Sequence, residues 1–87
     1  MPTISRFFGI SIKMYYDEHN PPHFHAFYQD FEAMFEIGTG IRIAGKFPPK
    51  GEKIIREWAK EYKENLLEVW NLMRTEKPFK KVPGADR

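Results

Sequence analysis

The chain has 87 residues, a net charge of +2 and no cysteine. Its length fits a single domain with one core, and the absence of cysteine excludes disulfides and thiolate metal sites and is compatible with a reducing cytoplasm. No apolar stretch is long enough to span a bilayer, and the N-terminus lacks the pattern of a signal peptide. We therefore expect a cytoplasmic protein with no membrane partner.

The first half of the chain alternates apolar and polar residues, which is typical of half-buried β-strands. The pattern predicts four or five strands, at residues 3–8, 10–16, 23–29, 31–37 and 41–44. Gly, Asn, Asp and Pro residues separate these segments and mark turns. Because the connections are short, the strands must pair antiparallel, as a meander.

The spacing of apolar residues changes at Pro48-Pro49, after which they recur every three or four positions as far as Met73. This spacing predicts an amphipathic helix. One helix from Lys50 to Thr75 would be about 38 Å long, longer than a small sheet is wide. The sequence therefore leaves open one long helix or two short helices with a break at residues 62–65. The fold class is α+β: a small antiparallel sheet packed on one face by the C-terminal helix or helices.

We expect residues 1–77 to form the single domain. Pro78 and Pro83 end the helical region, and the C-terminal end of the chain is rich in Lys and Arg. Residues 78–87 are therefore expected to form a basic, flexible tail.

The alternation also assigns residues to the two faces of the sheet. If the apolar residues of the second and fourth strands face the helices, Phe24, Ala26 and Tyr28 belong to the core. His23, His25 and Phe27 then point to the helix-free face. This face is also expected to carry Lys13, Tyr15, Glu32, Met34, Glu36 and Arg42. We interpret it as a binding surface; the alternative is an ordinary solvent-exposed sheet face.

All three histidines of the chain lie in the segment 19–25, around Asn20-Pro21-Pro22. Three interpretations compete. In the first, His23 and His25, with Cα atoms about 6.7 Å apart on one strand, bind a metal ion together with His19. Asp17 or Glu18 would then supply an oxygen ligand. The spacing permits such a site without being diagnostic of it, and we predict neither a metal nor another cofactor.

The second interpretation is metal-free acid–base chemistry at an RNA phosphate. His23 and His25 would act as base and acid, and His19 would orient the site. The residues that would contact phosphate or stack on bases are Arg6, Lys13, Arg42, Tyr15 and Phe27.

The third interpretation is structural. An imidazole can hydrogen-bond the backbone carbonyls next to Pro21 and Pro22 and so fix a rigid turn. The histidine segment would then be a structural or recognition turn, and the protein need not be an enzyme.

Three segments together resemble a bacterial family, the domain-of-unknown-function family numbered 4160. They are the opening MPTISRFFGI, the segment EHNPPHFHA and the helical segment IIREWAKEYKENLLEVW, and the resemblance covers residues 1–83. Members of that family commonly sit beside a gene for a second small protein, an arrangement similar to toxin–antitoxin pairs. The resemblance thus implies a partner protein encoded by an adjacent gene.

The leading hypothesis is a small RNA-directed member of such a two-gene system. In one form of this hypothesis the protein is a metal-free ribonuclease that uses the histidine cluster. The alternative is a non-enzymatic protein-binding module, and a metal-dependent hydrolase comes third. The sequence leaves open whether the protein is catalytic, what its substrate is, and whether it is the inhibitory or the neutralising member of a pair.

Overall fold

A computed structural model describes residues 3–15 and 19–86. The described residues form a five-stranded antiparallel sheet whose strands lie side by side in chain order. The strands are β1 (Thr3–Phe7), β2 (Ile10–Lys13), β3 (His23–Tyr28), β4 (Phe31–Glu36) and β5 (Arg42–Lys46). They are followed by two helices, α1 (Pro49–Glu61) and α2 (Lys63–Arg74). The predicted α+β meander with C-terminal helices is confirmed.

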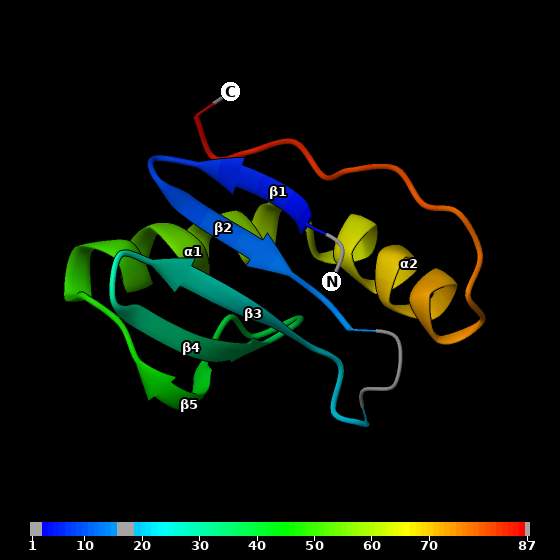
Figure 1. Cartoon of the computed structure of the whole chain (residues 1–87), viewed down its shortest axis with the longest axis horizontal. Coiled ribbons are helices and arrows are strands. Elements are labelled where there is room, and N and C mark those ends of the chain that lie inside the picture. The colour runs from blue at the N-terminus through cyan, green and yellow to red at the C-terminus, as the bar shows by residue number, and fades with distance from the viewer. Residues whose placement is uncertain (1–2, 16–18, 87) are drawn as a thin grey trace.

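Both helices lie on the same side of the sheet, and the opposite side carries no helix (Figure 1). The core fills the space between the two layers. Trp58 of α1 has its ring centroid 4.9 Å from that of Phe7 on β1 and 5.6 Å from that of Phe24 on β3. From α2, Leu66 and Trp70 are buried. The strand residues that alternate toward the helices are therefore the ones that the helices cover.

The helical region consists of two helices. Tyr62 separates them, with φ −107° and ψ 26°. Its amide still donates to the carbonyl of Trp58 at 3.0 Å, and its own carbonyl accepts from the amide of Leu66 at 2.9 Å. The break is therefore a bend between consecutive helices. It keeps the buried residues of both helices, Ile55 in α1 and Trp70 in α2, in one core.

Strand β5 is the most exposed element of the sheet, since all five of its residues are exposed. Its pairing with β4 shifts between Met34 and Phe35: Met34 pairs with Ala44, but Phe35 pairs with Arg42. The extra residue, Ile43, makes this a β-bulge. Gly45 has φ +82°, and a Cβ added there would overlap the carbonyl oxygen of Glu32. Only glycine fits this position without a shift of the backbone.

We expected residues 78–87 to form a flexible tail; in the structure residues 78–86 contact the rest of the domain at several points, although about half of them are exposed. They run alongside β1 (Figure 1), where the amide of Val82 donates to the carbonyl of Ile4 at 2.8 Å. The indole Nε1 of Trp58 donates to the carbonyl of Pro83 at 2.8 Å. Val82 is buried, with 5% of its surface exposed. Prolines hold this segment extended, so it can follow the strand without pairing along its full length.

Within the described ranges, neither helix has the length and apolar character that crossing a membrane requires.

Candidate functional site

The pairing of the strands defines the helix-free face. In antiparallel strands, residues that pair directly share one face of the sheet. One row across the sheet runs from Arg6 on β1 to Lys46 on β5, through Ser11, Phe27 and Glu32. The neighbouring row consists of Lys13, His25, Met34 and Ala44.

The centre of this face is a group of three rings with a lysine beside them, which we call the aromatic cluster: Lys13, Tyr15, His25 and Phe27. The ring centroid of His25 lies 4.5 Å from that of Tyr15 and 6.5 Å from that of Phe27. The Nζ atom of Lys13 lies 5.2 Å from the centroid of Phe27, which is within reach of a cation–π interaction. All four side chains are half-buried. The structure therefore brings together four residues that the sequence placed on this face.

His23 has surroundings that alternation alone did not predict. Its ring is next to that of His25, with centroids 5.4 Å apart, but only 4% of the residue is exposed. It packs against Trp70 of α2, with centroids 5.3 Å apart, and its Nδ1 donates to the carbonyl of Pro21 at 2.8 Å. His23 shares the face of its pairing partner Glu36, as the alternation predicted, but it is not exposed there, because its ring packs against Trp70 of α2. The bond to Pro21 is the one that the structural interpretation anticipated.

His19 is exposed in the loop that leads to β3. The neighbouring Asn20 accepts a hydrogen bond from Arg74 of α2 at 3.5 Å, which brings this loop close to the end of α2. Among residues 3–15 and 19–86, no group of three or more His, Asp or Glu side chains lies close enough to hold a metal ion. Asp17 and Glu18, which we considered as oxygen ligands, lie outside the described residues.

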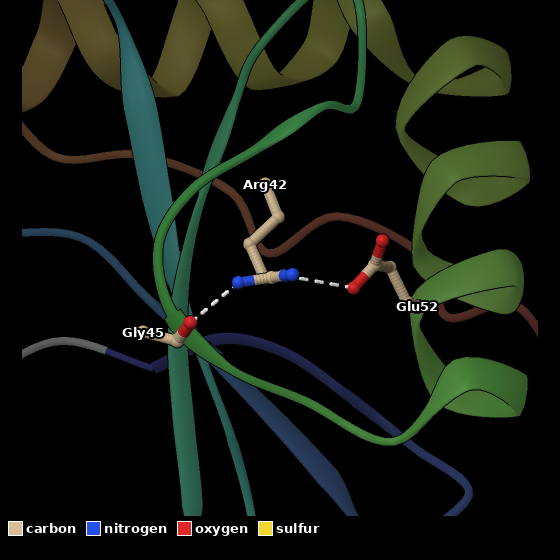
Figure 2. Close-up of polar contacts among 3 residues, drawn as sticks. All are labelled: Arg42, Gly45 and Glu52. Carbon is tan, nitrogen blue, oxygen red and sulfur yellow. Dashed lines mark hydrogen bonds and ion pairs between the residues drawn. The ribbon is translucent and has the colours of Figure 1, made fainter.

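The two arginines that we expected to contact phosphate lie on different sides of the sheet. Arg6 is exposed on the helix-free face, at the end of the row through Phe27. Arg42 is on the side of the helices: its Nε donates to Oε1 of Glu52 on α1 at 2.9 Å, and its Nη1 donates to the carbonyl of Gly45 (Figure 2). Our assignment of Arg42 to the helix-free face is wrong, because the bulge in β5 inverts the alternation at this residue.

Two polar residues of the helix-free face were missed. Ser11 lies between Ile10 and Ile12, so its position followed from the alternation that we used for its neighbours. Lys46 was missed for a different reason, since the sequence pattern ended the last strand at residue 44. Its pairing with Glu32 places it on this face.

One comparison with known proteins identifies a protein family. A family model described as "Domain of unknown function (DUF4160)" matches residues 9–71. This is more than half of the chain, so the protein belongs to this family, as the resemblance in its sequence indicated. The matched segment includes β2 to β5, the histidine segment, α1 and most of α2. No curated protein and no solved structure matches the chain.

Proposed function

We propose that this member of the DUF4160 family is an RNA-directed protein that binds single-stranded RNA on the helix-free face of its sheet. The observation that carries the proposal is the aromatic cluster, in which Tyr15, His25 and Phe27 lie side by side with the ammonium group of Lys13 at 5.2 Å from the Phe27 ring. Bases of a single strand stack on such rings, and each stacked base contributes about 1–3 kcal/mol of binding free energy.

The charges of the face support a nucleic-acid ligand of modest affinity. Arg6 and Lys46 stand at the two ends of the row that contains Phe27, and Lys13 stands in the next row. These three cations can contact phosphate groups on either side of stacked bases. Two carboxylates, Glu32 and Glu36, share the face with the three cations, so its formal charge is only +1. Stacking, rather than charge alone, must therefore provide much of the affinity.

Binding is better supported than cleavage. Acid–base cleavage of RNA needs two groups within reach of the reacting atoms. His23 is buried against Trp70, and its Nδ1 donates a hydrogen bond to the carbonyl of Pro21. Both contacts favour a structural role for this histidine. His25 is the histidine of the aromatic cluster, and His19 is the exposed one. If the protein also cleaves RNA, the acid–base pair would therefore be His25 and His19, and not His25 and His23.

A second candidate function is a protein-binding module without catalytic activity, working with the product of an adjacent gene. The bond from His23 to Pro21 favours it, because it fixes the Asn20-Pro21-Pro22 turn as a rigid loop, and a rigid loop loses little conformational entropy when a partner binds. The two candidate functions are compatible if the partner binds the loop and the RNA binds the aromatic cluster.

The RNA proposal is tested by fluorescence anisotropy with a labelled uridine-rich oligonucleotide of about 10 nucleotides. We compare Phe27→Ala with Phe31→Ala, which makes the same change at a residue that pairs with Tyr28 and lies off the helix-free face. Phe27→Ala should weaken binding by roughly 5- to 150-fold, the equivalent of one lost stacking contact. Phe31→Ala should leave it unchanged. No binding at low salt, or equal losses in both variants, would contradict the proposal.

Cleavage is tested in the same samples. The RNA products are analysed by mass spectrometry with and without EDTA. Cyclic 2′,3′-phosphate ends that persist in EDTA and disappear in both His25→Ala and His19→Ala would establish the ribonuclease version. If the RNA stays intact although binding is clear, the protein is an RNA-binding module without ribonuclease activity.

A further inference from the structure

The two edges of the sheet differ in whether another segment covers them. The outer edge of β1 is covered by residues 78–86, with a hydrogen bond from Val82 to Ile4. No described segment pairs with the outer edge of β5, where the sheet ends. An open edge presents unpaired backbone donors and acceptors to which another extended chain can add.

The open edge is also unusually apolar for an exposed strand. Ile41 is 52% exposed and Ile43 is 45% exposed, and they are two of only four large apolar residues that are exposed in the described chain. Ile43 belongs to β5 and Ile41 immediately precedes this strand. Two exposed isoleucines beside open backbone groups are typical of a surface that another polypeptide covers.

A cavity of about 490 Å³ lies between β5 and α1, next to this edge. Its polar lining has four cations and two carboxylates: Arg42, Lys53, Arg56, Lys60, Glu52 and Glu57. Arg42 and Glu52 pair with each other at 2.9 Å (Figure 2). The remaining lining has three cations to one carboxylate, so the cavity attracts acidic groups.

We propose that the β5 edge and the adjoining cavity bind an extended, acidic segment of a partner protein. The segment adds as a strand to the outer edge of β5, its apolar side chains cover Ile41 and Ile43, and its carboxylates meet Lys53, Arg56 and Lys60. This site is separate from the aromatic cluster and does not depend on RNA binding. The inference therefore stands or falls independently of the proposed function.

Two alternatives fit the edge less well. A second copy of the chain would present the same excess of cations, Lys53, Arg56 and Lys60, to this cavity, so it lacks the charge complementarity of an acidic segment. RNA would meet the cations but would leave the isoleucines and the open backbone groups uncovered. The bulge at Ile43 and the positive φ of Gly45 shorten the usable edge, which suits a short peptide segment.

The test uses the full-length protein, labelled with ¹⁵N, and two short synthetic peptides. One alternates glutamate with valine, and the other alternates lysine with valine. The acidic peptide should shift the amide resonances of β5 and the first turns of α1, and the lysine peptide should not bind. Arg56→Glu should weaken binding of the acidic peptide by about tenfold or more, whereas Lys80→Glu, the same type of charge change on the far C-terminal segment, should not.

The inference would be overturned by no binding of the acidic peptide up to millimolar concentration, by equal binding of the lysine peptide, or by resonance shifts confined to the helix-free face. Displacement of the peptide from β5 by a uridine-rich oligonucleotide would also overturn it, because RNA would then be the better ligand of this edge. If Arg56→Glu fails to fold, Lys53→Glu tests the same cavity from the neighbouring turn of α1.

Discussion

His23 and His25 are two residues apart on one strand, yet they have different chemical roles available to them. His23 donates to the carbonyl of Pro21 and packs against Trp70. His25 lies between the rings of Tyr15 and Phe27 on the helix-free face. The difference comes from the contact of His23 with Trp70 of α2, which buries the His23 ring. Each histidine therefore needs its own test, and a loss of function in His23 variants can arise from loss of structure.

We predict that His23→Ala destabilises the protein by about 2–3 kcal/mol. The change removes the hydrogen bond to the carbonyl of Pro21, worth about 1 kcal/mol, and leaves a gap against Trp70. His19→Ala is the matched control, because His19 is exposed and should change stability by less than about 0.5 kcal/mol. Urea unfolding measures both. Equal stability of the two variants would refute a structural role for His23.

At the scale of elements, the alternation of apolar and polar residues predicts the strands well until the bulge. The meander, the core positions on β3 and β4 and the C-terminal helical region all follow from spacing. The faces of β5 do not, because the inserted residue reverses the alternation between Ala44 and Arg42, and nothing in the local pattern marks Ile43 as the inserted one. This is why Lys13, Tyr15, His25 and Phe27 could be assigned to one face from sequence and Arg42 could not.

The C-terminal segment shows a second limit of sequence patterns. It has no periodicity, so composition alone indicated a flexible tail. Its attachment depends on single contacts with residues distant in the chain: Val82 with Ile4, and Pro83 with the indole of Trp58. Such contacts leave no regular spacing in the sequence.

We predict that Val82→Ala lowers the free energy of unfolding by about 1–2 kcal/mol, because Val82 is 95% buried and the change removes two methyl groups from the core. Lys80→Ala, two residues earlier and exposed, is the control and should be neutral. Hydrogen exchange at the Val82 amide provides an independent readout. Rapid exchange in the unmodified protein, with no effect of Val82→Ala on stability, would show that the segment does not stay on β1.

At the scale of the whole molecule, the proposed ligands use different parts of the surface. The aromatic cluster lies on the helix-free face, and the β5 edge and its cavity lie beside α1. A net charge of only +2 over the chain means that neither surface relies on the overall field of the protein. Local chemistry must select the ligand: rings with a few cations for RNA, and isoleucines with open backbone groups for a peptide.

The salt dependence expected for the proposed RNA binding follows from the cations of the helix-free face. If Arg6, Lys13 and Lys46 each contact one phosphate, the logarithm of the binding constant should fall with the logarithm of salt concentration with a slope of about −2. Lys46→Ala should reduce the steepness of this slope by about 0.7. Lys53→Ala, in the cavity beside α1, should leave it unchanged. If the slope changes only in the Lys53 variant, the RNA binds at the cavity beside α1 and not on the helix-free face.

The most direct test of the central claim is a titration of the ¹⁵N-labelled protein with a single-stranded uridine-rich oligonucleotide, followed by amide resonances. If the aromatic cluster is the RNA site, the largest shifts should occur at Lys13, His25 and Phe27. Smaller shifts should occur at Arg6, and α1 should not change. Shifts confined to the β5 edge and α1, or a spectrum that does not change at low salt, would contradict RNA binding on the helix-free face.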